Sequence, residues 1–203
     1  MEKQHHITAV ILARAGSKRL PGKNKKELGG RPLVAWAIIE ALRSAYIDEV
    51  IVSSDDEDIL AIANDYSVRH LQRPPILCTD EASPYDGIRH AVAHVPPDII
   101  VSHVVLLQPT SPLRNVDDID LCIKTCLDMS LEAAATAAPE ATVPNGAVYI
   151  STLEWLINGG NWDQDGLHLV PMPRSRSQDI DTPEDFLEAE RAIMERAMPG
   201  YIG

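Results

Sequence analysis

The run of residues 14–24, with the sequence RAGSKRLPGKN, combines small residues with cationic side chains. Small residues let the backbone approach phosphate groups, backbone N–H groups form an anion cradle, and the Arg and Lys side chains neutralise the charge. The spacing matches neither G-x-x-x-x-G-K-[ST] nor G-x-G-x-x-G. We therefore predict a polyphosphate-binding loop that belongs to neither of these common classes.

Two carboxylates near the C-terminal end of the chain are suited to binding a divalent cation. Asp179 and Asp181 precede Thr182, a natural helix N-cap, and Pro183, which suits the first helical position. In an extended segment, residues two apart face the same side, and carboxylates on one face suit Mg²⁺, which also binds substrate phosphates. The alternative is an acidic helix N-terminus stabilised by the helix dipole. The basic loop elsewhere in the chain favours the metal site.

A third polar segment, residues 106–114 (LLQPTSPLR), forms a loop between two prolines. The amide of Gln108 can both donate and accept a hydrogen bond, so it suits a substrate hydroxyl or a base edge. The alternative is a simple turn before the next helix. Residues 79–83 are equally open to two interpretations, because they could contact a ligand or form only a helix cap.

Alternating strand and helix patterns predict the elements that hold these loops. Apolar runs predict strands, and helical spacing predicts helices. The predicted strands are residues 7–13, 49–53, 68–71, 99–107, 147–151 and 167–170, with a further strand and a loop within residues 129–144, and the predicted helices are residues 32–42, 56–66, 83–95, 116–129 and 184–197. The alternation predicts an α/β fold with a doubly wound, mostly parallel sheet and helices on both faces. In such sheets ligands bind beyond the carboxyl ends of the strands, where the polar loops converge.

Composition and charge narrow the function classes. With 203 residues, the chain is most simply a single domain over residues 1–203. The net charge of −12 argues against partners such as nucleic acid or an anionic membrane surface. No apolar run is long enough to span a bilayer, so we predict a cytoplasmic protein. Cys122 and Cys126 lie four apart on a predicted helix and are expected to be buried apolar residues rather than a metal pair.

Taken together, these motifs resemble the acylneuraminate cytidylyltransferases, the CMP-sialic acid synthetase group of the nucleotidyltransferases. The matching segments, in family order, are residues 13–24, 52–59 (VSSDDEDI), 106–114, 145–150 (NGAVYI) and 179–186 (DIDTPEDF). The Gln-Pro-Thr-Ser-Pro loop favours this branch over the related 3-deoxy-manno-octulosonate cytidylyltransferases, which carry Gln-Gly-Asp there. The resemblance implies a Rossmann-type fold like that of the nucleotide-diphospho-sugar transferases. It also implies a CTP-dependent enzyme that transfers CMP to a sialic-acid-like 2-keto-3-deoxy sugar acid and releases pyrophosphate.

The resemblance also implies a role for each matching residue. Arg14 and Lys23 are the catalytic residues and stabilise charge on the α-phosphate and the leaving group. Asp179 and Asp181 bind Mg²⁺, and Gln108 faces the acceptor. The implied nucleotide-binding residues are Ala13, Ala15, Gly16, Ser17, Lys18, Asn24, Ala82 and Ser83, the last two contacting cytosine. Family members are commonly homodimers.

The chain departs from the family between the central strand and the NGAVYI motif, where it is shorter and has no Arg or Lys between Lys124 and Arg174. Arg174 and Arg176 are therefore candidate acceptor-binding residues, with a solvated basic rim as the competing interpretation. The shortening motivates a second hypothesis, in which the acceptor is a small acid such as a phosphonate of the phosphonoformate type. Two further hypotheses are a guanylyl- or uridylyltransferase on the same fold and a non-catalytic nucleotide-binding protein.

Overall fold

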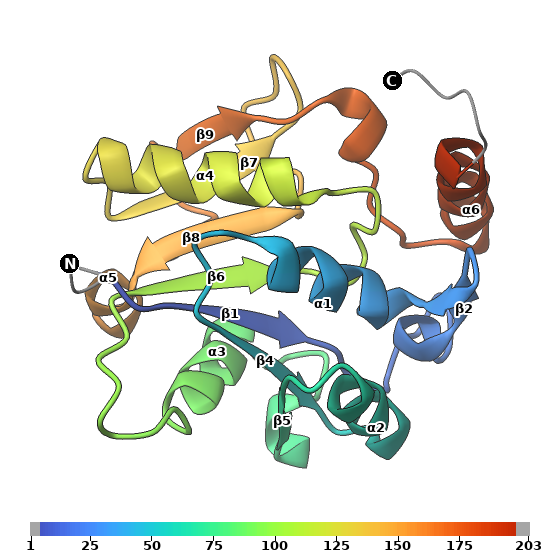
Figure 1. The fold of residues 1–203 in the computed structure, drawn as a ribbon, viewed down its shortest axis with the longest axis horizontal. Helices are drawn as coiled ribbons and strands as arrows, with labels where there is room; N and C mark the ends of the chain where they lie inside the picture. Colours follow the sequence, from blue (N-terminus) through green and yellow to red (C-terminus); the bar gives the residue numbers. More distant parts are fainter. Residues whose placement is uncertain (1–4, 198–203) are drawn as a thin grey trace.

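The computed structural model of the chain describes residues 5–197. Its centre is a seven-stranded sheet with the strand order β5-β4-β1-β6-β8-β7-β9 (Figure 1). The strands are β1 (Ile7–Leu12), β4 (Glu49–Ser54), β5 (Arg69–Gln72), β6 (His103–Leu107), β7 (Ala133–Ala137), β8 (Val148–Thr152) and β9 (His168–Pro171). Only β8 runs antiparallel to its neighbours within this sheet. The mostly parallel sheet confirms the predicted α/β fold.

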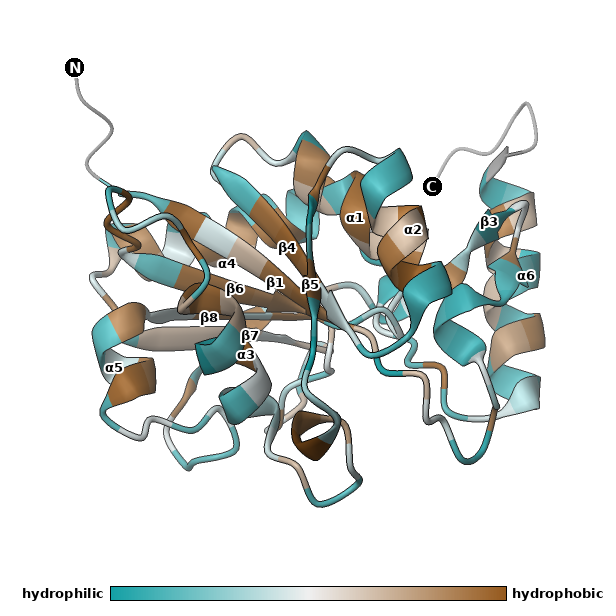
Figure 2. Cartoon of the chain, turned by 90° about the horizontal axis from the view of Figure 1, so that it is seen from below, coloured by the Kyte–Doolittle hydropathy of each residue, from teal (hydrophilic) through white to brown (hydrophobic). Residues whose placement is uncertain are grey.

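Helices cover both faces of the sheet, as the hydrophobic clusters and Figure 2 show. One face packs against α1 (Leu33–Arg43), α2 (Glu57–Asp65) and α4 (Val116–Asp128). The other packs against α3 (Pro84–Val92) and the short α5 (Leu153–Ile157). The central strands β1, β4 and β6 are almost entirely buried and mostly apolar, as expected for strands covered on both faces, whereas the edge strand β5 is largely exposed.

A third, smaller cluster lies beyond the carboxyl ends of the central strands. There α6 (Pro183–Ala197) packs on the two-stranded hairpin of β2 (Glu27–Leu28) and β3 (Arg31–Pro32). In Figure 1 the arrowheads of β1 and β6 point toward this side of the molecule. The hairpin directly follows the basic loop, and α6 directly follows the acidic motif. This cluster therefore brings the two ends of the chain that carry the predicted chemistry to one edge of the sheet.

Several boundaries differ from those expected. The strand predicted at residues 99–107 begins at His103, because its pairing with β1 starts at the partners Ile7 and His103 and the residues before them have no strand beside them. The hairpin β2–β3 and α5 were not predicted. Pro32 lies just before the first residue of α1 rather than within the helix. Residues 1–4 and 198–203 of the predicted single domain lie outside the described residues.

The predicted burial of two cysteines is confirmed. Cys122 and Cys126 on α4 are fully buried in the main core. Burial raises the pKa of Cys122, and it raises the pKa of Cys126 to about 11, so both thiols stay protonated at neutral pH. No helix within residues 5–197 is both long and apolar enough to cross a membrane.

Candidate active site

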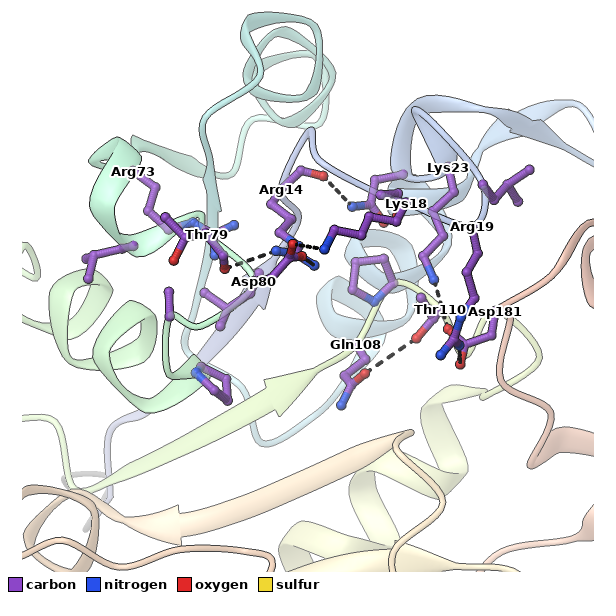
Figure 3. Close-up of a pocket in the computed structure, with 18 of the residues that line it drawn as sticks. Arg14, Lys18, Arg19, Lys23, Arg73, Thr79, Asp80, Gln108, Thr110 and Asp181 are labelled. Atoms are coloured by element: carbon purple, nitrogen blue, oxygen red, sulfur yellow. Dashed lines mark hydrogen bonds and ion pairs between the residues drawn. The ribbon is translucent and has the colours of Figure 1, made fainter.

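A cavity of about 590 Å³ opens where β1 and β6 end (Figure 3). Its walls come from four segments that are distant in the sequence. They are the loop after β1 (Arg14, Lys18, Arg19, Lys23), the segment before α3 (Thr79, Asp80, Ala82, Ser83), the loop after β6 (Gln108, Thr110) and Asp181. This position at the carboxyl edge of a parallel sheet is where α/β folds bind their ligands.

Backbone contacts fix the shape of the loop after β1. The buried side chain of Asn24 donates from Nδ2 to the carbonyl of Arg14 at 2.9 Å, and the N–H of Ala15 donates to Oδ1 of Asp55 at 2.8 Å. Ala13 is fully buried and continues the strand by donating to Ser53. A Cβ added to Gly16 would meet no atom within 4 Å, so the protein leaves open space beside this backbone. Such space suits an anion cradle.

The cations of this loop contact carboxylates. Arg14 lies 2.9 Å from Asp80 and also donates to the carbonyls of Cys78 and Thr79, and Lys18 pairs with the same Asp80. The sequence does not single out Asp80, although it lies within the segment 79–83 that is interpreted as a ligand contact or a cap. Its two ion pairs show that this segment faces the basic loop.

The basic loop also contacts the acidic motif. Lys23 donates from Nζ to the carbonyl of Ile180 at 2.6 Å and lies 3.4 Å from Asp181, which Arg19 contacts at 2.7 Å. The structure thus brings the predicted catalytic lysine and one predicted metal ligand into direct contact. These partners are more than 150 residues apart in the sequence.

Asp179 lies beside Asp181 but is not part of the cavity wall. Partial desolvation raises the pKa of its carboxyl and the charge of Asp181 adds to the rise, whereas a hydrogen bond from Thr110 acts in the opposite direction. Within residues 5–197 no group of three or more His, Cys, Asp or Glu side chains could hold a metal ion. A Mg²⁺ site commonly uses only one or two carboxylates with substrate phosphates, so the pair fits that role.

The loop after β6 is held by a buried arginine. Arg114, only 2% exposed, donates from Nη1 to the carbonyl of Gln108 at 3.1 Å and to that of Ala147 at 2.8 Å. Burial lowers its pKa to about 10, which still leaves it charged at neutral pH. Arg114 therefore joins the loop of Gln108 to the NGAVYI segment. The side chain of Gln108 itself lines the cavity and accepts a weak hydrogen bond from Thr110.

The segment expected to contact cytosine has a structural role as well. Ala82 and Ser83 both line the cavity, and Ser17 lines it from the basic loop. The hydroxyl of Ser83 accepts from the N–H of Tyr85 at 3.2 Å and so caps α3. Ser83 therefore caps the helix, as one interpretation predicted, and it also lines the cavity.

The structure does not bring the two candidate acceptor-binding arginines into the cavity. Arg176 forms a two-bond ion pair with the buried Asp118, at 2.8 and 2.7 Å, at the N-terminal end of α4. Arg174 is exposed and donates to the carbonyl of Pro139 in the loop between β7 and β8. Arg176 therefore has a partner that accounts for its position, and Arg174 lies against a surface loop.

A buried cation in the cavity wall was missed. Arg73 is 4% exposed, lines the cavity, and donates from Nη2 to the carbonyl of Ser53 at 2.9 Å. Its Nε has no hydrogen-bond partner among the residues that the structure describes, and burial lowers its pKa. A buried charge with an unused donor is costly unless a ligand satisfies it. In the sequence, Arg73 is distinguished only as the residue before a Pro-Pro break.

Comparison with known proteins identifies relatives over most of the chain. The family model of the cytidylyltransferases matches residues 8–149. The CMP-N,N'-diacetyllegionaminic acid synthase of Legionella pneumophila is 31% identical over 226 positions, which cover 92% of this chain and 96% of that protein. The N-acylneuraminate cytidylyltransferase of Oncorhynchus mykiss is also 31% identical, over 98% of this chain but only 44% of its own length.

Solved structures share the fold at lower sequence identity. A CMP:2-keto-3-deoxy-manno-octonic acid synthetase complexed with CTP aligns with a TM-score of 0.74 and 18% identity, covering 95% of this chain and 100% of that chain. A nucleotidyl transferase from Methanothermobacter aligns with a TM-score of 0.73 and 13% identity, covering 94% and 99%. Since the sequence matches extend over most of the chain, the protein belongs to the cytidylyltransferase family, in the branch that includes the acylneuraminate cytidylyltransferases.

Proposed function

We propose that the protein transfers CMP from CTP to a sugar acid and releases pyrophosphate. The observation that carries this proposal is the meeting of the basic loop and the acidic motif in one cavity, where Lys23 contacts both Ile180 and Asp181. Cations on one side and carboxylates on the other are what phosphoryl transfer needs to stabilise a triphosphate and its metal.

In the proposed reaction the hydroxyl oxygen of the sugar acid attacks the α-phosphorus of CTP and loses its proton to solvent. A new P–O bond forms to the acceptor, and the bond to the β-phosphate breaks, so that its electron pair leaves with pyrophosphate. Arg14 and Lys23 stabilise the charge that develops on the α-phosphate and the leaving group. Lys18 and the backbone around Gly16 hold the remaining phosphates.

The base is proposed to lie against the segment before α3. Ala82 and Ser83 line this part of the cavity, and Arg73 also belongs to the cavity wall. Backbone groups together with a buried guanidinium suit the acceptor and donor atoms on a pyrimidine edge. If GTP or UTP were consumed faster than CTP, this assignment of the base would be wrong.

Asp179 and Asp181 are proposed to hold Mg²⁺. Bound there, the cation would act as a Lewis acid on the phosphates. Burial, and after it the charge of Asp181, raises the pKa of Asp179, and a cation held by the two carboxylates would offset both effects. Lys23 and Arg19 pair with Asp181 in the structure. With the cation bound, both would be free to contact phosphate oxygens.

A second candidate for the acceptor is a small acid such as a phosphonate. The alignment with the Legionella relative extends over 226 positions, more than the 203 residues of this chain, so that relative contains residues that are missing here. Residues 138–147, which join β7 to β8, contain no Lys or Arg. A reduced acceptor side favours a smaller molecule.

A panel experiment tests these proposals. Purified protein is incubated with Mg²⁺, each of the four nucleoside triphosphates, and either 2-keto-3-deoxy sugar acids or phosphonoformate, and pyrophosphate release is measured. We expect release with CTP and a sugar acid. Release with phosphonoformate alone would favour the second candidate, whereas CTP binding without release on any acceptor would favour a non-catalytic nucleotide-binding protein. We also expect a cytoplasmic homodimer, and light scattering of the eluted protein tests the dimer.

A further inference from the structure

Asp80 lies inside the cavity, between two cations of the basic loop (Figure 3). Its Oδ1 is 2.9 Å from Nη2 of Arg14, and its Oδ2 pairs with Nζ of Lys18. The same short segment also accepts two hydrogen bonds from Nη1 of Arg14, at the carbonyls of Cys78 and Thr79. Arg14 therefore directs both of its terminal nitrogens at residues 78–80.

This arrangement places a carboxylate where the proposed chemistry requires phosphate oxygens. Carboxylates and phosphates are bound by Arg through the same forked geometry, and both attract the point charge of Lys. Arg14 and Lys18 cannot give their best geometry to a phosphate while Asp80 lies between them. One anion must replace the other.

The contacts of Asp80 are weak enough to be replaced. The side chains of Arg14 and Asp80 are 35% and 36% exposed, and that of Lys18 is 78% exposed, so water screens both pairs. Lys18, and after it Arg14, lowers the pKa of Asp80, which is therefore a monoanion at neutral pH. A polyphosphate carries several negative charges and outcompetes a single carboxylate.

Asp80 differs in this respect from Asp181, the other carboxylate that contacts the loop. Asp181 pairs with Arg19 and Lys23, but it has a proposed role as a metal ligand once the nucleotide is bound. Asp80 has no such second role, and its carboxylate makes no other ion pair within residues 5–197. Its contacts with Arg14 and Lys18 are thus the whole of its interaction with the site.

We propose that Asp80 is a displaceable counter-ion of the polyphosphate cradle and sets its affinity. It holds Arg14 and Lys18 before the nucleotide binds, releases them to the triphosphate, and pairs with them again as pyrophosphate leaves. This deepens the proposed function and rests on it for the identity of the polyphosphate. The competition itself can be measured without any transfer reaction.

The test compares Asp80→Asn with Glu81→Gln. Glu81 is the exposed neighbour and makes no ion pair with any described residue, so its substitution removes the same charge without touching the loop. Inorganic pyrophosphate is titrated into each variant and the parent protein by calorimetry, without nucleotide, at several salt concentrations. We expect Asp80→Asn to bind pyrophosphate about three- to tenfold more tightly at low salt, and Glu81→Gln to stay within about twofold of the parent.

The salt dependence provides an independent measurement. Asp80 neutralises part of the positive charge of the loop, which dissolved anions would otherwise screen. Its removal should therefore make pyrophosphate affinity fall more steeply with added salt. Asp80→Ser, with a smaller side chain, should repeat both effects, and circular dichroism checks that each variant is folded. Equal or weaker binding by Asp80→Asn than by Glu81→Gln would overturn the proposal. If the expected shift appears but no CMP is transferred to any acceptor, the counter-ion stands and the proposed function fails.

Discussion

The two sides of the cavity differ in the way their charges are used. On the nucleotide side, Arg14, Lys18 and Lys23 each contact a carboxylate within the cavity. On the proposed acceptor side, the neighbouring residues 138–147, which are not part of the cavity wall, contain no cation, and Arg176 pairs with Asp118 at α4 instead. Under the proposed assignment, phosphate recognition relies on charge, whereas acceptor recognition relies on hydrogen-bonding groups such as the Gln108 amide.

The largest expected effect is on the nucleotide side. Lys23→Met should lower kcat for pyrophosphate release by about 10²- to 10³-fold, the loss typical of removing one preorganised donor from a transition state. Lys25→Met is the matched control, because Lys25 lies only two residues after Lys23 but pairs with Asp56 and Asp58 outside the cavity. If the two variants lost activity equally, charge on this loop would act only at long range.

The next largest effect is expected on the Mg²⁺ dependence of activity. Asp181→Asn and Asp179→Asn should each raise the Mg²⁺ concentration for half-maximal activity by about 10- to 100-fold, since even outer-shell changes at metal sites reach this range. A Mg²⁺ titration of the initial rate measures it. Glu184→Gln removes an exposed charge from the first turn of α6 and should leave the titration unchanged. Unchanged titrations in both Asp variants would contradict the metal assignment.

A prediction of intermediate size concerns the link between the two sides. Arg114→Met leaves the carbonyls of Gln108 and Ala147 without their buried donor. We expect the free energy of unfolding to fall by about 2 kcal/mol, within the cost of unsatisfied buried groups. This loss of stability lowers the urea concentration at the midpoint of unfolding. In kinetics, KM for the acceptor should rise more than KM for CTP. A rise in KM for CTP alone would place Arg114 on the nucleotide side.

The smallest effects on activity are expected for the two arginines outside the cavity. Arg174→Gln should change acceptor KM by less than about twofold, because its carbonyl and carboxylate partners lie in a solvated loop. Arg176→Gln should leave acceptor KM equally unchanged but lower the free energy of unfolding by about 2 kcal/mol, since the buried carboxylate of Asp118 loses its ion-pair partner. A large rise in acceptor KM in either variant would show that the acceptor side uses charge after all.

The parts of this site that follow from local pattern could be predicted from the sequence. The strand before Arg14, the helix after Thr182 and the loop after β6 each depend on neighbouring residues, through hydrophobic periodicity and capping. The convergence of their loops follows from the rule that parallel strands end at the same edge.

The pairings within the site could not be predicted, because they depend on contacts between distant residues. The carbonyls of Cys78 and Thr79 accept from an arginine 64 and 65 residues away, and Arg176 meets a carboxylate 58 residues away. Such pairs compete with water and with every other charge on the surface. The sequence does not indicate whether a lone basic residue such as Arg73 or Arg176 will be buried, paired or exposed.

The connection between β7 and β8 has a consequence for how this enzyme family diversifies. Since β7 and β8 are hydrogen-bonded antiparallel neighbours, the two ends of residues 138–147 are held side by side whatever the length of the chain between them. Doubling the length of such a loop costs only about 0.6 kcal/mol of closure entropy. Insertions, or a segment grafted from a longer relative, can therefore change this connection while the sheet and the basic loop stay unaltered.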